Sequence, residues 1–331
     1  MLGVVLSGAL LWWAFHSVQN PAQVITVLAH SDPWRFAVAT LFATLIFPLR
    51  ARRWRTILDP VFPRLPFGPL WRSTAVGMMI NNTVPARAGE VARAYALTRE
   101  TPVPFSTSIA SLAVDRVFDA IVLLALAAAA LLDPAFPAGA QIMGRPVAHI
   151  AVAGSFTVLL LLVALYALVF FPDQLIRLFE LFARRLSPTI EAKGSAALRT
   201  FSHGLSVLRS PGHFVAVFCW TAAHWLVNAL GWWIAMKAVG IVVPFSAALL
   251  VQTLVALGVA VPSTPGFVGV FEAAAVAGLH AVYNVPESLA LSWALGFHVL
   301  SFIPITLIGI YYFLRMGLNI GEIRAQQTAT S

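Results

Sequence analysis

Cysteine is nearly absent from this sequence, since Cys219 is the only one among 331 residues. A single thiol cannot form a disulfide framework or a cysteine-based metal site within one chain. The sequence also lacks an HExxH pair, a CxxC pair, a Walker loop and a GxSxG nucleophile elbow. We therefore predict no catalytic residue, no cofactor and no metal ligand, and we expect the protein not to be an enzyme.

Charge is scarce as well. Asp, Glu, Lys and Arg make up 10% of the residues, whereas an average soluble domain has about 25%. Hydrophobic residues account for 60% of the chain, and the mean hydropathy is +0.85. This composition indicates an all-α polytopic membrane protein whose core is the helix bundle itself.

The few charges are mostly positive and mostly arginine. The formal net charge is +8, and lysine occurs only at Lys193 and Lys237. The arginines lie beside apolar segments and not on one soluble face, which argues against nucleic acid as the partner and fits the positive-inside rule. Because arginine grips phosphate through two parallel hydrogen bonds, we expect an anionic lipid headgroup to bind; topology and codon usage account for part of the bias.

Six segments are apolar enough to be predicted as bilayer spans, which take about 20 residues each. They are residues 1–18, 34–49, 106–132, 149–171, 213–236 and 289–314. The first is expected to remain uncleaved, the second to end at Pro48 and the arginine cluster that follows, and the last to kink at Pro304. Residues 1–315 would then form one integral-membrane domain, and residues 316–331 a short cytoplasmic tail.

Two further pairs of apolar segments are interrupted by breaker motifs. Residues 70–83 and 89–97 flank one motif, and residues 245–260 and 267–283 flank the other. These segments are short for helices that cross a bilayer, so each pair is predicted to enter the membrane partway and form a re-entrant helical hairpin. Breaks at corresponding places in the two halves predict an inverted repeat around a site near the membrane midplane.

The placement of arginine predicts the orientation. Residues 50–99 and 173–210 carry most of the arginines and are expected to be cytoplasmic, whereas residues 19–33 and 133–147 hold only Arg145. Six spans then place both termini in the cytoplasm, and the two hairpins enter the inner (plasma) membrane from opposite sides. Apolar residues recur at helical spacing opposite arginines within residues 173–210, which predicts an amphipathic helix at the membrane surface.

The first breaker motif supplies a candidate anion site. Pro85 ends one helix, and a second helix is expected to begin near Gly89. Its free N–H groups and Arg87 would bind a phosphate. An internal ion pair between Arg87 and Glu90 is the alternative. Asn82 is expected either to contact the headgroup or to satisfy backbone carbonyls at the break.

Charged residues inside a predicted span extend this candidate site. Asp115 and Asp119 share one helix face, with Arg116 about 100° away around the helix. Charge at membrane depth is costly and needs a partner. We expect Arg87, Arg93 or the arginine cluster after Pro48 to pair with the two carboxylates, which either hold these arginines in place or take up a proton during transport.

The second breaker motif contributes Ser263, Thr264 and, within the following apolar segment, Glu272. Glu272 is expected either to couple transport to protons or to form a hydrogen bond with the opposing hairpin.

Together these motifs resemble the lysylphosphatidylglycerol synthase transmembrane region, a family of flippase-like membrane proteins. The resemblance covers about residues 1–315 and includes Arg53 in the predicted substrate site. It rests on Arg52-Arg53-Trp54, the run from Asn82 to Glu90 with Arg93, Asp115, Arg116 and Asp119, and Pro265-Gly266-Phe267-Val268-Gly269 with Glu272. The family's second motif commonly reads Pro-Gly-Gly-x-Gly, so Phe267 departs from it.

The resemblance implies a lipid translocase. In large family members the region resembles the flippase half of the multiple peptide resistance factor, which moves aminoacylated phosphatidylglycerol between leaflets. The sequence contains no counterpart of the synthase domain, so we expect no aminoacyl transfer. The expected cargo is an anionic phospholipid or an isoprenoid or glycolipid. The alternatives are a lipid-modifying membrane enzyme, with Asp115 or Glu90 as base, and a non-transporting partner of a lipid-synthesis protein.

Overall fold

The computed structural model describes residues 12, 21–84, 88–137, 139, 141–142, 145–205, 210–259 and 265–323. Apart from residue 12, the first predicted span therefore lies outside the description. The described chain is a bundle of helices with one antiparallel pair of two-residue strands, β1 (Gln141–Ile142) and β2 (Arg145–Pro146). The helices are α2 (Pro21–Ala29), α3 (Pro33–Leu58), α4 (Phe67–Thr83), α5 (Gly89–Glu100), α6 (Phe105–Leu131), α7 (Val147–Phe170), α8 (Pro172–Leu186), α9 (Pro188–Leu205), α10 (Pro211–Ala238), α11 (Phe245–Gly258), the 3-10 turn η2 (Pro265–Phe267), α12 (Val270–Tyr283) and α13 (Glu287–Arg315).

Four described segments are long and apolar enough to cross a membrane: α3, α10, α13 and the stretch Pro265–Tyr283. α6 has 27 residues, so it is long enough, but it carries three charged side chains in its first 15 residues. The chain is thus a multi-pass membrane protein, as its composition predicts.

α3 shows one error of the sequence-based prediction. Its N-terminus is capped by Asp32, whose side chain accepts hydrogen bonds from the N–H groups of Trp34 and Arg35. The helix was expected to end at Pro48, but it continues to Leu58. The prediction was wrong because the cluster after the proline does not leave the bundle as a whole: Arg53 is fully buried and paired with acids on another helix.

The segment 173–210 holds two described helices where one was expected. α8 ends at Leu186, and α9 begins at Pro188 and packs against α8. Proline forces the residue before it out of the helical region, and Ser187 accordingly has φ −168° and ψ 137°. α8 keeps the predicted amphipathic character, since Leu178 and Phe182 are both more than half exposed.

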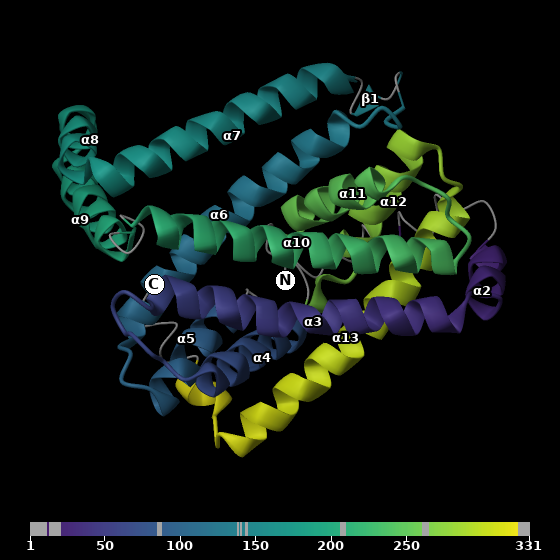
Figure 1. Ribbon diagram of the computed structural model, residues 1–331, viewed down its shortest axis with the longest axis horizontal. Helices are drawn as coiled ribbons and strands as arrows, with labels where there is room; N and C mark the ends of the chain where they lie inside the picture. Colours follow the sequence, from purple (N-terminus) through teal and green to yellow (C-terminus); the bar gives the residue numbers. More distant parts are fainter. Residues whose placement is uncertain are drawn as a thin grey trace.

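α3 and α10 share the most extensive helix–helix contact and run side by side along the long axis of the bundle (Figure 1). α8 and α9 lie at one end of this axis and α2 lies at the other end (Figure 1). The N–H of Asp32 donates to the carbonyl of Ala238 at 2.9 Å, which places the start of α3 beside the end of α10. The pair is therefore antiparallel and forms the frame for the shorter helices.

The two interrupted segments form two helix pairs, and these start at opposite ends of that frame. α4 packs against α5, and both contact Leu58 at the end of α3 through a cluster with Leu70 and Leu97. α11 packs against α12 and starts at the other end, where the indole N–H of Trp233 in α10 donates to the carbonyl of Val243. The end of α4 and the start of α5 form the inner end of the first pair, and the end of α11 and the start of α12 form the inner end of the second. Both inner ends lie toward the middle of the bundle, where η2 contacts α4.

Close contacts at glycine shape these pairs. A Cβ on Gly89 would overlap the carbonyl oxygen of Gly77, so α4 and α5 approach through their backbones. η2 packs against α4, and a Cβ on Gly266 would lie 3.4 Å from the carbonyl oxygen of Asn82. Gly266 has φ +68°, and Phe267 has φ +59°. Phe267 thus adopts a conformation that favours glycine, the residue usual in the motif that the sequence resembles.

Candidate functional site

A buried network of charged side chains lies between α3, α5 and α6. At its centre is Arg53 of α3, whose side chain is fully buried. Its Nε lies 2.5 Å from Asp115 Oδ1, and its Nη1 lies 2.6 Å from Asp119 Oδ1. Both carboxylates come from α6 and are four residues apart, so they project from the same face of that helix. One arginine therefore bridges two helical turns of α6.

Arg93 of α5 adds a second cation to Asp115. Its Nη1 lies 3.3 Å from Asp115 Oδ2, and its guanidinium carbon lies 4.1 Å from the centre of the Trp54 ring. Trp54 is held in turn by a 2.7 Å hydrogen bond from its indole N–H to Ser111 Oγ. Stacking on an aromatic face and pairing with a carboxylate offset the cost of burying the guanidinium.

Arg116 connects this network to the first helix pair. Its Nε lies 2.7 Å from Glu90 Oε1, and its Nη1 lies 3.2 Å from Asp119 Oδ2. Asp119 also accepts a 2.8 Å hydrogen bond from the indole N–H of Trp225 in α10. The network thus joins α3, α5, α6 and α10. Among the described residues, no group of three or more His, Cys, Asp or Glu side chains is placed to hold a metal ion.

Arg50 is the member of the cluster that no acid neutralises. It lies one turn before Arg53 on α3, and in the described part of the chain no carboxylate oxygen is within 4 Å of its guanidinium. Its Nε is buried and donates no hydrogen bond to a described residue. With Arg53, Arg93 and Arg116, four arginines face the three carboxylates of Glu90, Asp115 and Asp119, which leaves one positive charge unmatched.

A cavity of about 370 Å³ adjoins the network at the inner ends of the two helix pairs. Its polar wall comes from α3, α4, α5, α6 and α10: Arg50, Asn81, Asn82, Glu90, Arg116, Asp119 and Trp225. A second wall comes from α11, the residue that follows it and η2, and it is mainly apolar: Thr253, Ala256, Leu257, Val259 and Phe267. Ala120, Leu123 and Leu124 of α6 and Met78 of α4 complete the apolar lining. The cavity therefore offers cationic and apolar surface side by side.

The cavity lies near the middle of the long helices that line it. Asp119 is the 15th of the 27 residues of α6, and Trp225 is the 15th of the 28 residues of α10. Arg50 is the 18th of the 26 residues of α3, somewhat nearer the end that carries the arginine cluster.

The two asparagines at the inner end of α4 have structural partners. Asn81 Oδ1 accepts the N–H of Gly89 at 2.9 Å, and Asn82 Nδ2 donates to Thr306 Oγ1 of α13 at 2.9 Å. α5 begins at Gly89, as predicted, but Asn81 already occupies one N–H of its first turn. The helix N-terminus is thus a weaker anion site than the sequence suggested, and Arg50 supplies the free cation instead.

Most of the predicted site residues lie together. Asn82, Glu90, Arg116 and Asp119 line the cavity, and Arg53, Arg93 and Asp115 stand directly behind it in the network. The expected pairing of Asp115 and Asp119 with Arg93 and with the cluster after Pro48 is confirmed, the cluster member being Arg53. Arg87, Ser263 and Thr264 lie outside the described residues. The predicted ion pair between Arg87 and Glu90 therefore stays a prediction, and the described partner of Glu90 is Arg116.

Glu272 is placed away from the cavity. It is 2% exposed, its Oε2 accepts the N–H of Gly269 at 2.7 Å, and its Oε1 lies 2.6 Å from Nδ1 of His298 in α13. This carboxylate fixes the start of α12 and ties it to α13. Of its two expected roles, proton coupling and a hydrogen bond to the opposing hairpin, the structure shows a hydrogen bond. The partner, however, is His298 of α13 and not a residue of the opposing hairpin.

Sequence reasoning missed Arg50, Trp225 and Thr253 as cavity residues. Arg50 stands three residues before Arg53, so helical periodicity places both on one face once the helix continues past Pro48. Trp225 was read as part of an ordinary span, because one tryptophan in an apolar run carries no signal of a buried carboxylate partner.

The helices and the buried network define a multi-pass membrane protein with an amphipathic cavity. The chain belongs to the family described as the lysylphosphatidylglycerol synthase TM region, which matches residues 1–309. Two UPF0104 membrane proteins of Methanothermobacter thermautotrophicus are similar over nearly their whole length. One is 24% identical over 93% of this chain and 90% of its own, and the other is 26% identical over 87% and 86%.

A third relative is similar over a shorter stretch. Glycosyltransferase AglD of Haloferax volcanii is 36% identical over 120 residues, which are 36% of this chain and 19% of that protein. The match thus covers about a fifth of AglD.

Proposed function

We propose that the protein binds the anionic headgroup of a lipid in the central cavity and moves that lipid between the two leaflets. The observation that carries the proposal is the unmatched guanidinium of Arg50 on the wall of a cavity whose other wall is apolar. A phosphate can accept two hydrogen bonds from a guanidinium, and acyl or isoprenoid chains need apolar surface. The volume of about 370 Å³ falls in the usual range of about 300–1,000 Å³ for sites that hold small molecules.

The arrangement of the two helix pairs supports this proposal. In it, α4–α5 and α11–α12 are re-entrant hairpins that enter the bilayer from opposite sides and meet at the cavity. Such paired breaks near the midplane are typical of transporters built from inverted repeats. The C-terminal part of α3, which carries four of its five arginines, lies at the same end of the bundle as α8 and α9 (Figure 1), and we assign this end to the cytoplasmic side of the inner (plasma) membrane. This orientation places both termini in the cytoplasm.

The test is a leaflet assay on purified protein in liposomes. A headgroup-labelled phosphatidylglycerol is placed in both leaflets, and an impermeant quencher reports how fast inner-leaflet label reaches the outside without ATP. We expect faster exchange than in protein-free liposomes. A labelled isoprenoid phosphate and a labelled glycolipid serve as further cargo arms, because the relatives do not fix the lipid, and zwitterionic phosphatidylcholine serves as the comparison for an anionic headgroup.

Arg50→Ala is the decisive variant in this assay. It removes a charge-assisted hydrogen bond worth about 1.5–3 kcal/mol, so the affinity for the headgroup should fall roughly 10- to 150-fold. Arg50→Lys should restore only part of the loss, because lysine lacks the bidentate fork. The matched control is Arg55→Ala on the same helix, where Arg55 pairs with Asp59 at 3.7 Å and does not line the cavity. Equal effects of the two alanine variants would contradict the proposal.

The likeness to a protein named a glycosyltransferase gives a second candidate, an enzyme acting on a lipid phosphate or lipid-linked sugar. The likeness is confined to 120 residues, so it supports this candidate only weakly. Lipid extracts from the same liposomes would distinguish the two. Conversion of the lipid into a new compound, without any change of leaflet distribution, would favour the enzyme over the translocase.

A further inference from the structure

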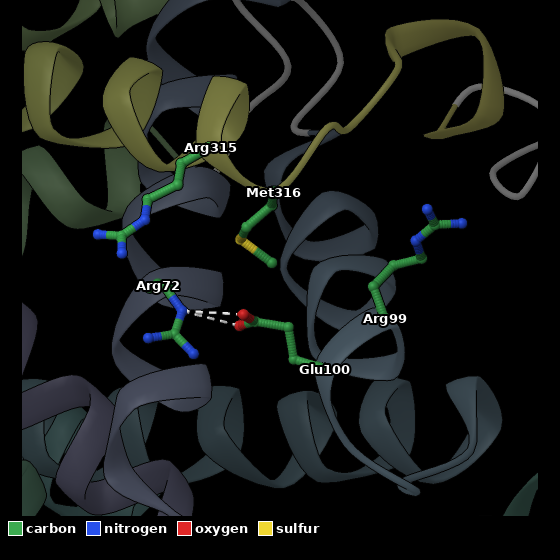
Figure 2. A pocket seen from close by; sticks show the side chains of 5 residues that line it. All are labelled: Arg72, Arg99, Glu100, Arg315 and Met316. Carbon is green, nitrogen blue, oxygen red and sulfur yellow. Dashed lines mark hydrogen bonds and ion pairs between the residues drawn. The ribbon is translucent and has the colours of Figure 1, made fainter.

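A second cavity, of about 330 Å³, opens at the outer end of the first helix pair. It is lined by Arg72 of α4, Arg99 and Glu100 of α5, and Arg315 and Met316 at the end of α13 (Figure 2). Arg72 and Asn82, which lines the central cavity, are ten residues apart on α4 and therefore about 15 Å apart along its axis. The two cavities are thus distinct sites on one hairpin.

Arginines from three different helices line this second cavity. Arg72 Nε lies 3.0 and 2.9 Å from the two carboxylate oxygens of Glu100, so this pair is internally neutral. In the described part of the chain, Arg99 and Arg315 have no carboxylate oxygen within 4 Å. Figure 2 shows Arg72 and Arg315 on one side of the Glu100 and Met316 side chains and Arg99 on the other side. Three arginines against one acid leave two positive charges around one hollow.

A second acid near the cavity, Glu322, forms no ion pair with Arg99 or Arg315 within the described residues. Glu322 follows the end of α13, and its Oε2 accepts a 2.6 Å hydrogen bond from the hydroxyl of Tyr95. It does not line the cavity. A solvated face of scattered arginines would need no explanation, but here residues of α4, α5 and α13 line one common cavity. In the structure Arg315 Nη1 donates to the hydroxyl of Tyr311 at 3.1 Å.

We propose that this outer cavity binds a phosphate group, and that it does so independently of the central cavity. Arg99 and Arg315 would donate to the phosphate oxygens, and Arg72 would contribute a third donor while staying paired with Glu100. The ligand is the headgroup of an anionic phospholipid in the adjacent leaflet or a soluble phosphate monoester, which share this chemistry. Anionic leaflets attract exposed arginine near the membrane surface, so the lipid source fits the arginine-rich end of the bundle.

The test is a calorimetric titration of the detergent-solubilised protein with two probes. Dioctanoyl phosphatidylglycerol represents the lipid headgroup, and glycerol 3-phosphate represents the soluble source. Each titration is repeated on Arg50→Ala protein, in which the central cavity has lost its unmatched cation. Binding that persists in Arg50→Ala belongs to the outer cavity, so failure of this proposal and failure of the translocase proposal give different results.

The informative variant is the double substitution Arg99→Gln with Arg315→Gln, which leaves the pair of Arg72 and Glu100 intact. We expect binding of at least one probe to weaken about tenfold. The matched control removes the same charge from the exposed arginines Arg177 and Arg185 of α8 and should leave binding unchanged.

Glu100→Gln gives an outcome that misfolding cannot imitate. It frees Arg72 from its carboxylate, so phosphate should bind several times more tightly than in the wild type. Loss of phosphatidylglycerol binding alone in the double variant identifies a lipid headgroup, and loss of glycerol 3-phosphate binding alone identifies a soluble ligand. If the double variant and the α8 control bind both probes equally well, or if Glu100→Gln does not tighten binding, the site does not exist as proposed.

Discussion

The buried network predicts a large stability loss for a substitution that changes almost no volume, Asp115→Asn. The Asp115 side chain is fully buried, 2.5 Å from Arg53 Nε and 3.3 Å from Arg93 Nη1. Without its charge, buried Arg93 is left with no described carboxylate partner, and Arg53 keeps only Asp119. Breaking a buried pair by removing one partner costs about 3–5 kcal/mol, because the other charge stays uncompensated.

The magnitude is measured against a partly exposed pair on α3. Asp59→Asn makes the same chemical change, but Asp59 and Arg55 are 3.7 Å apart and their side chains are 29% and 32% exposed. An exposed pair contributes about 0–1 kcal/mol. In detergent, the apparent melting temperature of Asp115→Asn should therefore fall several times further than that of Asp59→Asn.

A double variant tests the reason for this loss. Adding Arg93→Met to Asp115→Asn removes the stranded cation and leaves Arg53 paired with Asp119. We expect the double variant to be more stable than Asp115→Asn alone, a coupling that independent sites would not show. Equal losses for Asp115→Asn and Asp59→Asn, or no recovery in the double variant, would refute the claim that the network stabilises the fold through charge pairing.

Two further stability predictions follow from close contacts elsewhere. Gly89→Ala should destabilise the protein by about 1–3 kcal/mol, because its Cβ would overlap the carbonyl oxygen of Gly77. Gly212→Ala, where a Cβ would lie 3.9 Å from its nearest neighbour, Ser210 Oγ, should not lower the melting temperature and serves as its control. His298→Leu should cost about 1–3 kcal/mol, since Glu272 would lose the partner at 2.6 Å. Adding Glu272→Gln should recover part of that loss, and a melting temperature below that of His298→Leu alone would contradict the assignment.

The sequence predicts several parts of this structure because they depend on local chemistry. Proline and glycine punctuate the chain strongly, so the helix restart at Gly89 is found in the expected place. A carboxylate inside an apolar span needs a cation, so the partners of Asp115 and Asp119 could be sought among a few arginines.

Other parts depend on contacts between distant segments. The end of α3 was misplaced because an arginine cluster after an apolar run has two interpretations, solvated at the membrane surface or buried against acids. Only the position of α6 decides between them for Arg53. The same holds for Trp225 and Asp119, which are 106 residues apart, and for the attachment of Glu272 to His298.

The uneven distribution of charge around the central cavity has a consequence for its mechanics. The wall formed by α3, α5 and α6 is cross-linked by ion pairs, and separating the buried ones, Arg53 with Asp115 and Asp119 and Arg93 with Asp115, costs several kcal/mol each. The wall formed by α11 and η2 contributes no ionisable side chain to the described lining. The first wall thus acts as a rigid, preorganised electrostatic surface, while the second can slide without breaking an ion pair. Any opening of the cavity should accordingly be a shear of α11 over a stationary charged face.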